Sequence, residues 1–251
     1  MIAVYFSGTG NSRYAAELFA EKMQCKSISI EEQCDFDLLM QEASEIAFFF
    51  PIYGSCPPII MRKFVQIHKK ALQGKKLLLF CTQAMASGDG ARSLLDELNG
   101  ISYEVIYAEH FIMPGNICNM RIPALPKAVY RKLTQRKIRK IHADLMRRKY
   151  KRKGFHWLSI MLGNAQRIPF QKKEKEYAAS IQISDTCIGC KKCIRSCPAG
   201  NLFFEDGRVK AKAQCTLCYR CMNGCPQKAI TNWIQKPVKK QYRGIFSERI
   251  S

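Results

Sequence analysis

The 251-residue sequence predicts two unlike domains, an α/β domain with a doubly wound five-stranded parallel sheet and then a small α+β domain built around cysteines. Three uneven distributions predict this division. Short apolar runs alternate with amphipathic stretches in about the first 150 residues. Eight of the 13 cysteines lie between Cys187 and Cys225. Residues 121–183 carry 18 of the 41 basic residues and three of the 20 acidic ones, so much of the net charge of +21 lies between the two domains.

Five apolar runs are the expected strands of the first domain. They are residues 2–6, 27–30, 46–50, 77–81 and 103–107. Helical spacing follows the first run, and amphipathic stretches lie near residues 57–71 and 91–99. Runs that are apolar on both faces and alternate with helices indicate a parallel sheet covered on both sides. In such a sheet, ligands bind at the carboxyl ends of the strands.

The loop after the first run has the composition of a phosphate site. It consists of Ser7, Gly8, Thr9, Gly10, Asn11 and Ser12. Glycines allow close approach of the backbone, hydroxyls and an amide donate hydrogen bonds, and the following helix offers free N–H groups. The loop contains no lysine, which excludes a GxxxxGK[ST] nucleoside triphosphate loop, and no GxGxxG fingerprint is present. A capped helix after a tight turn would use the same residue types.

Two further loops follow the third and fourth runs. The first contains Pro51, Ile52, Tyr53 and Gly54, and the second contains Thr82, Gln83, Ala84, Met85, Gly88, Asp89 and Gly90. With these loops, the first 150 residues resemble the flavodoxin family, whose phosphate loop reads Ser/Thr-x-Thr-Gly-Asn-Thr/Ser. The resemblance implies bound FMN, with Tyr53 on the ring and the Gly54 backbone near flavin N5. The chain departs from the family at Met85, where a second aromatic is common, and Tyr53 could instead cover the sheet.

The cysteines form two runs with the same spacing. Cys187, Cys190, Cys193 and Cys197 are followed by Pro198, and Cys215, Cys218, Cys221 and Cys225 by Pro226. Each cysteine of the second run lies 28 residues after its counterpart, for example 215 − 187 = 28. Leu202 and Ile230 are related in the same way. The second domain is therefore an internal two-fold repeat.

The pattern C-x2-C-x2-C-x3-C-P resembles that of bacterial ferredoxins with two [4Fe–4S] clusters. The resemblance implies that Cys187, Cys190, Cys193 and Cys225 bind cluster one, and that Cys215, Cys218, Cys221 and Cys197 bind cluster two. It also implies that Ile194, Leu202 and Ile230 shield the clusters. Paired CxxC units in a zinc site are the alternative. Asn201 stands where such ferredoxins usually have alanine. A domain of about 50 residues would depend on its clusters to fold.

The other five cysteines have no partner at metal spacing. They are Cys25, Cys34, Cys56, Cys81 and Cys118. We interpret them as ordinary structural residues, although Cys56 lies near the second loop and could be a redox thiol.

The segment between the two domains is strongly basic. One amphipathic helix is expected between residues 125 and 150, with its apolar face formed by Leu125, Val129, Leu133, Ile138, Ile141 and Leu145. We divide the chain into residues 1–150, a connector 151–180, the cluster domain 181–235 and a basic tail 236–251. The basic surface favours docking of an acidic redox protein. Peripheral membrane contact through the patch around Trp157, nucleic-acid binding without a recognition motif, and a solvated face without a partner are the alternatives.

The two domains together indicate a cytoplasmic electron-transfer protein that relays electrons between two [4Fe–4S] clusters, FMN and an external partner. The chain resembles the fused flavodoxin–ferredoxin family of anaerobic bacteria. The first alternative is a flavin-dependent reductase of a quinone or enone, which leaves open whether the protein is an enzyme. The second is a redox-sensing module that binds nucleic acid. The sequence has no apolar run long enough for a transmembrane segment and no secretory signal at its start.

Overall fold

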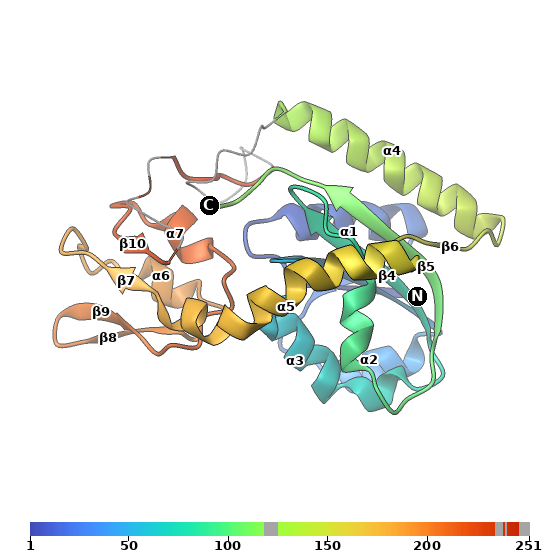
Figure 1. The fold of residues 1–251 in the computed structure, drawn as a ribbon, viewed down its shortest axis with the longest axis horizontal. Coiled ribbons are helices and arrows are strands. Elements are labelled where there is room, and N and C mark those ends of the chain that lie inside the picture. The colour runs from blue at the N-terminus through green and yellow to red at the C-terminus, as the bar shows by residue number, and fades with distance from the viewer. Residues whose placement is uncertain (118–124, 234–237, 239, 246–251) are drawn as a thin grey trace.

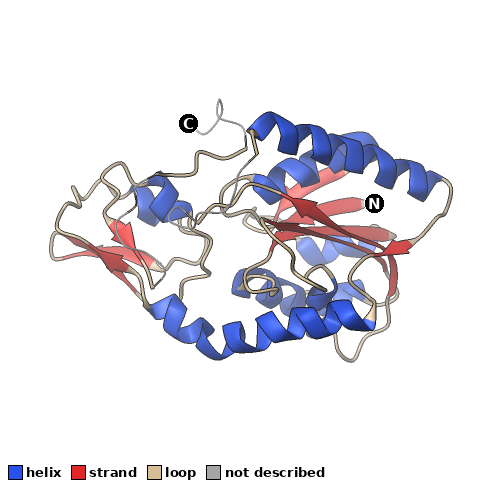
Figure 2. Cartoon of the chain, turned by 45° about the horizontal axis from the view of Figure 1, so that its top comes forward, coloured by secondary structure: helices blue, strands red, loops and turns tan. Residues whose placement is uncertain are grey.

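The computed structural model describes residues 1–117, 125–233, 238 and 240–245. The first domain is built on a sheet with the strand order β2-β1-β3-β4-β5-β6, in which every pair is parallel (Figures 1 and 2). The strands are β1 (Ile2–Tyr5), β2 (Lys26–Ser29), β3 (Glu45–Pro51), β4 (Lys76–Gln83), β5 (Glu104–Ile112) and β6 (Lys151–Arg152). The doubly wound parallel fold is confirmed.

The strand count is six where the sequence predicts five. The added strand β6 pairs only two residues, with Lys151 opposite Tyr107 and Arg152 opposite Ala108. Both residues of β6 are exposed and charged, so no apolar run marks this strand in the sequence. An ion pair holds it in place, because Lys151 Nζ lies 2.7 Å from the buried carboxylate of Glu109 on β5.

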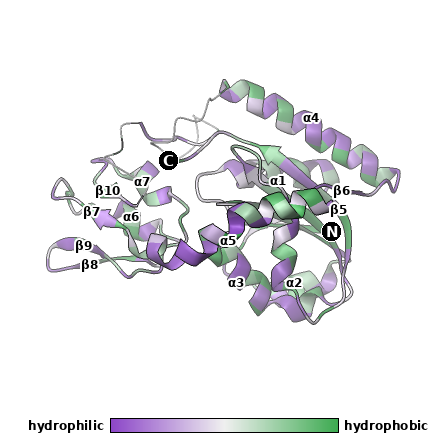
Figure 3. Cartoon of the chain, viewed as in Figure 1, coloured by the Kyte–Doolittle hydropathy of each residue, from purple (hydrophilic) through white to green (hydrophobic). Residues whose placement is uncertain are grey.

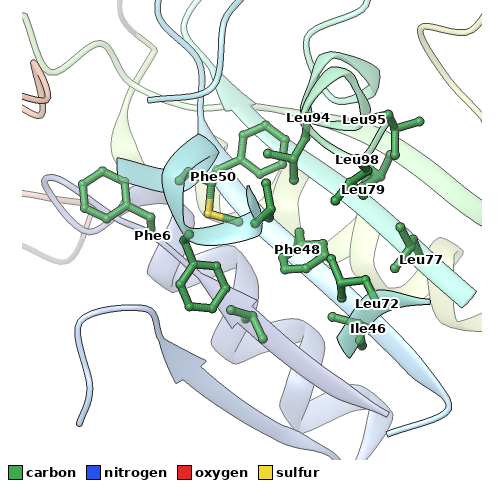
Figure 4. Packing of buried hydrophobic residues seen from close by; sticks show 14 of the residues in the cluster. Phe6, Ile46, Phe48, Phe50, Leu72, Leu77, Leu79, Leu94, Leu95 and Leu98 are labelled. Carbon is green, nitrogen blue, oxygen red and sulfur yellow. The ribbon is translucent and has the colours of Figure 1, made fainter. Parts of the chain in front are cut away.

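Helices cover both faces of the sheet. On one face lie α1 (Asn11–Met23) and α4 (Lys127–Met146), and on the other lie α2 (Phe36–Glu42), α3 (Ile59–Ile67) and the 3₁₀ turns η1 (Lys69–Leu72) and η2 (Arg92–Glu97). Successive side chains of a strand point to opposite faces, so Val4 and Phe6 join the second layer while Ala3 and Tyr5 join the first. Figure 4 shows the second layer, where Phe48 and Phe50 pack with leucines of η1, β4 and η2.

Helix α4 is the last helix of the first domain, but the prediction of which residues form its apolar face is only half correct. Ile138 and Ile141 are buried as expected, whereas Val129 and Leu133 are 37% and 45% exposed. Tyr130 and Thr134 take the inner face instead, because positions 130, 134, 138 and 141 follow one stripe of the helix and 129 and 133 are rotated from it by about 100°. Figure 3 shows hydrophobic and hydrophilic residues mixed along α4.

Most of the predicted connector is one long helix, α5 (Trp157–Ala179), with Pro169 inside it. It runs from the first domain to the second (Figures 1 and 2). Arg167 on α5 makes two hydrogen bonds to the buried carboxylate of Asp89, at 2.8 and 3.2 Å. Further along the helix, Glu174 accepts a hydrogen bond from Arg62 of α3. Helix α5 is therefore fixed to the first domain by polar contacts at two points along its length.

The second domain has two short antiparallel strand pairs and two short helices. Its elements are β7 (Gln182–Ile183), α6 (Lys192–Arg195), β8 (Leu202–Glu205), β9 (Arg208–Ala211), α7 (Arg220–Gly224) and β10 (Ile230–Thr231), with β7 paired to β10 and β8 to β9. Its hydrophobic cluster contains seven buried residues: Ile181, Leu202, Val209, Leu217, Tyr219, Met222 and Ile230.

The described part of the C-terminal tail folds back over both domains. Gln241 Nε2 donates to the backbone carbonyls of Met222 and Cys225 in the second domain, at 2.9 and 2.6 Å. Tyr242 Oη donates to Asn11 Oδ1 at 2.5 Å, and Ile245 is fully buried in the layer of α1 and α4. Within the described residues, no helix has the length and apolar character needed to cross a membrane.

Candidate functional site

The carboxyl ends of β1, β3, β4 and β5 surround a cleft with about 520 Å³ of space between its atoms. Its residues come from the loops at this edge of the sheet and from the strand ends beside them. The full lining is Ser7, Gly8, Thr9, Asn11, Ser12, Pro51, Ile52, Tyr53, Thr82, Gln83, Ala84, Met113, Pro114, Gly115, Asn116 and Ile117.

The loop after β1 keeps the N-terminus of α1 free. Gly10 takes the N-cap position with a φ of 97°, which favours glycine, and no side chain caps the helix. Gly10 N donates to Ser7 Oγ at 3.1 Å, while Asn11 Nδ2 donates to the Pro114 carbonyl at 2.9 Å. The alternative of a side-chain-capped helix is therefore wrong. Uncapped N–H groups at the start of a 13-residue helix suit an anionic phosphate.

Tyr53 forms one wall of the cleft. Its backbone exchanges two hydrogen bonds with Cys56, which closes a tight turn. Its hydroxyl is buried and has no hydrogen-bond partner in the described part of the chain. Burial, and then the nearby Cys218, raises the pKa of Tyr53 well above its usual value, so the phenol keeps its proton. A buried donor without an acceptor is a position that a bound ligand with acceptor atoms can satisfy, which fits FMN. Gly54 lies outside the cleft, with Phe170 of α5 packed where its side chain would be.

Only the first residues of the third predicted loop, which follows β4, line the cleft. Thr82, Gln83 and Ala84 line the cleft, and Thr82 Oγ1 lies 2.8 Å from Ser12 Oγ. Met85 does not line it and is 61% exposed.

Gly88, Asp89 and Gly90, the remaining predicted residues of this loop, also lie outside the cleft lining. A side chain at Gly88 would come within 2.5 Å of the backbone of α5 at Ser159, and Asp89 is the fully buried partner of Arg167. Gly88 and Asp89 thus support α5, a helix too distant in sequence for the loop pattern to indicate it.

Residues 113–117 are the part of the cleft that sequence reasoning missed. Strand β5 runs to Ile112, five residues beyond the predicted end at 107, and so it carries this loop to the same edge as the others. Asn116 Nδ2 donates to Thr9 Oγ1 at 3.1 Å. The sequence Pro114-Gly115-Asn116 was a usable signal, because turn residues directly after a strand mark a strand end.

The eight repeat cysteines surround two separate cavities in the second domain. One, with about 360 Å³ of space, is lined by Cys187, Cys190, Cys193 and Cys225. The other, with about 390 Å³, is lined by Cys215, Cys218, Cys221 and Cys197. The fourth cysteine of each run thus reaches the cavity of the other run. Ile230 lines the first cavity and Leu202 the second.

Backbone amides donate to several of these sulfurs. Asn201 N lies 3.3 Å from Cys197 Sγ, and Ala229 N, its counterpart 28 residues later, lies 3.4 Å from Cys225 Sγ. Such bonds are typical of thiolates that hold a cluster. The departure at Asn201 has a local reason, since its buried Oδ1 accepts a hydrogen bond of 2.7 Å from Gln214 N, just before the second run.

The cysteine geometry favours clusters over single metal ions. Among the described residues, no three cysteine, histidine or carboxylate side chains lie close enough together to hold one metal ion. Four sulfurs around each cavity are instead the ligand set of one [4Fe–4S] cluster. Burial raises the pKa of Cys215 to about 12 and that of Cys218 to about 11. Metal binding at these thiols must therefore release protons.

The cavity of the second run and the cleft share a wall. A side chain at Gly8 would come within 2.9 Å of Cys218 Cβ. Arg220 donates to the carbonyls of Ser7 and Gly8 at 2.8 and 3.0 Å and forms an ion pair with Glu31. Across this wall the rings of Tyr53 and Tyr219 lie edge to face, with 6.3 Å between their centroids.

The other described cysteines line neither the cleft nor the two cysteine cavities. Cys56 is buried, accepts a hydrogen bond from Gln171 and has its pKa raised to about 11 by burial. Burial also raises the pKa of Cys25 and Cys81. Cys34 is exposed, and Cys118 lies outside the described residues.

Comparison with protein families gives the decisive match. The model of the flavodoxin domain matches residues 2–150, more than half of the chain. The chain belongs to the flavodoxin-domain family. A 4Fe–4S dicluster domain matches residues 179–226 of this flavodoxin-domain protein. Its cofactors are therefore FMN and two [4Fe–4S] clusters.

Two curated relatives each match about a quarter of this flavodoxin-domain protein. One is a component of an ion-translocating oxidoreductase complex from Methanosarcina acetivorans, 41% identical over 59 residues, which cover 23% of this chain and 22% of the relative. The other is YsaA of Escherichia coli strain K12, a protein named for electron transport, 41% identical over 69 residues, which cover 25% and 44%. The chain thus spans less than half the length of either relative.

Two solved structures are similar to part of the chain. A flavodoxin from the domain Archaea covers 58% of this chain and 97% of its own, at 16% identity and a TM-score of 0.41. Two-electron reduced Megasphaera elsdenii flavodoxin covers 55% and 99%, at 18% identity and a TM-score of 0.40.

Proposed function

We propose that this protein relays electrons between an external redox partner and FMN through its two [4Fe–4S] clusters, and that it does so in the cytoplasm. When bound, FMN exchanges one or two electrons and each cluster exchanges one, so the chain joins one-electron and two-electron carriers. The observation that carries the proposal is the wall between the flavin cleft and the cavity of Cys215, Cys218, Cys221 and Cys197. The names of the two curated relatives also support electron transport as the role.

The side chains of the cleft hold and orient the flavin in this proposal. The free N–H groups at the start of α1, with Ser7, Thr9 and Asn11, bind the phosphate. Tyr53 covers the ring and donates its unpaired hydroxyl to an acceptor in the cleft. The loop of residues 113–117 closes the opposite wall and is fixed to the phosphate loop through Asn116.

Arg220 keeps the two centres close together. Its guanidinium bonds to two carbonyls of the phosphate loop and to Glu31, so it ties the second run of cysteines to the cleft. It is a permanent positive charge near Cys218. That charge favours an added electron at the cluster on this side. Cys218 and Tyr219 are 6% and 5% exposed, so the wall also excludes water.

The reductase alternative loses its structural argument. It requires an open pocket beside residues 85–90, but Gly88 and Asp89 lie beneath α5 rather than over the cleft. We therefore propose the relay alone.

An anaerobic experiment on the full chain tests the relay. We expect about eight irons and one flavin per chain. Flash reduction of the flavin should then be followed by electron transfer to a cluster within the same molecule, seen by absorbance and electron paramagnetic resonance at a rate independent of protein concentration. A chain with full iron and flavin content in which no electron passes between the centres would overturn the proposal.

A further inference from the structure

The two cysteine runs have equivalent backbones. Gly189 and Leu217, Lys191 and Tyr219, and Gly200 and Lys228 are each 28 residues apart, and all six have a left-handed φ between 52° and 67°. Each run ends its loop in a short helix, α6 in the first and α7 in the second. Residues at equivalent positions therefore face outward from their cluster in the same way.

In the second run, the outward positions are buried against the first domain. Thr216 is 4% exposed, and its Oγ1 accepts a hydrogen bond from Ile60 N at the start of α3. Tyr219 packs edge to face with Tyr53. Asn223 Nδ2 donates to the carbonyl of Asn116 at 2.9 Å. This face of the repeat is the one that meets the flavin cleft.

In the first run, the equivalent positions are uncovered. Ile188, the counterpart of Thr216, is 63% exposed, and Cys190, the counterpart of buried Cys218, is exposed as well. Lys191, Lys192 and Arg195 stand where the second run has Tyr219, Arg220 and Asn223, and all three are exposed. The same surface that receives a flavin domain at one cluster is left open and cationic at the other.

The charges of this face are unbalanced. The nearby acidic side chains are already paired, Asp185 with Arg208 and both Glu205 and Asp206 with Lys210. Within the described residues, none of Lys191, Lys192 and Arg195 makes an ion pair. Lys191 Nζ instead lies 4.3 Å from the ring centre of Phe204, which is 40% exposed. An apolar centre with a cationic surround matches a small, transient interface with an acidic partner.

We propose that an acidic one-electron carrier protein docks on this face, formed by Ile188, Cys190, Lys191, Lys192, Arg195 and Phe204. This inference rests on the proposed relay and adds which of the two clusters meets the external partner. The cluster held by Cys187, Cys190, Cys193 and Cys225 is the external terminal, and the other cluster serves the flavin. Each docking event moves one electron, so that the partner's centre is oxidised as this cluster is reduced, or the reverse.

The basic helix α4 is the competing surface. It carries more charge, but it packs on α1 and β5 of the first domain and lies away from α6 (Figure 1). A partner held there would not bring its redox centre to an exposed cluster ligand. The charge of α4 alone thus does not mark the docking face.

Carbodiimide cross-linking tests the assignment on the wild-type holoprotein. The probe is a purified bacterial ferredoxin with a strongly negative net charge. Because carbodiimide joins carboxylates to lysine amines, we expect cross-links at Lys191 and Lys192, mapped by mass spectrometry. Cross-links confined to lysines of α4 would overturn the inference.

Two matched double variants provide a second measurement. K191E/K192E should weaken binding of the same ferredoxin at least tenfold at low ionic strength, and high salt should remove the difference. R136E/K140E, which reverses two exposed charges on α4, should leave the affinity within twofold. The opposite ranking would overturn the inference. If iron analysis shows that K191E/K192E has lost its cluster, Arg195→Glu is used in its place. Flavin-to-cluster transfer inside the molecule is measured without the probe, so failure of the relay and failure of this docking face are distinguishable.

Discussion

The two domains are stabilised in different ways. The first has a layer of buried apolar residues on each face of its sheet, including Phe48, Phe49, Phe50 and Phe80, all fully buried. In the described part of the second, the hydrophobic cluster has seven buried residues, beside two cavities lined by cysteines. A core of that size supplies little stability, so what the cysteines bind must supply the rest. The hydrophobic core is therefore enough to stabilise the first domain, whereas the second domain depends on its bound clusters to fold.

Removal of iron should have the largest effect. Anaerobic chelation is expected to unfold the second domain and leave the parallel sheet intact. Hydrogen–deuterium exchange should show protection in β8, β9 and α7 falling at least about 100-fold, while amides of β3 and β4 change little. Unchanged protection of β8 and β9 in iron-free protein would contradict the comparison.

Breaking the buried ion pair of Asp89 and Arg167 should have the second-largest effect. Asp89→Ala leaves the Arg167 guanidinium buried without its carboxylate, which is expected to cost about 3–5 kcal/mol of unfolding free energy. Because Asp89 lies outside the cleft lining, the flavin affinity of the folded variant should be unchanged. Denaturant unfolding and flavin titration measure the two effects. Asp96→Ala, which removes a half-exposed partner at 3.9 Å, is the matched control and should cost less than about 1 kcal/mol. Loss of flavin binding without loss of stability would contradict the assignment.

Gly8 tests the contact between the domains. Gly8→Ala places a methyl group against Cys218 and should cost about 1–3 kcal/mol through overpacking. Gly224→Ala is the control, since nothing lies within 4 Å of its added carbon. Holoprotein unfolding with iron and flavin analysis measures both variants. Equal effects of the two substitutions would show that the domains do not meet at Gly8.

The smallest effect concerns pH. Burial, with the nearby Lys153, lowers the pKa of His110 to about 4 from its ordinary 6.5. The unfolded chain therefore binds a proton that the folded chain does not, and stability falls as the pH drops below 6.5. Between pH 6.5 and 5.5 the loss should be about 1 kcal/mol. All four histidines precede the cluster domain, so the loss belongs to the first domain.

The His110→Gln variant isolates this contribution. Anaerobic urea unfolding at both pH values should show a clearly smaller pH dependence than in the wild type, with iron content checked at each pH. An identical dependence in the variant would place the titrating group elsewhere.

The sequence alone determined those features that depend on residues close together in the chain. Alternating apolar runs gave the parallel sheet, and the composition of residues 7–12 gave the phosphate loop. The spacing of the eight cysteines gave the repeat. These signals are local, because strand burial, loop chemistry and ligand spacing are written within a few residues. The short strand β6 was missed because two charged residues form it, held by an ion pair rather than by burial.

Only the tertiary structure decided how these parts meet. Asp89 and Gly88 resemble loop residues of a cofactor site, but α5 packs over them from about 70 residues further along the chain. The two cysteine runs are nearly symmetric in sequence, and nothing in their spacing tells which cluster faces the flavin. That choice comes from the contact of Gly8 with Cys218, 210 residues apart (218 − 8), and from the hydrogen bonds of Arg220. Contacts at such separation depend on the shapes of two folded domains, which no local pattern encodes.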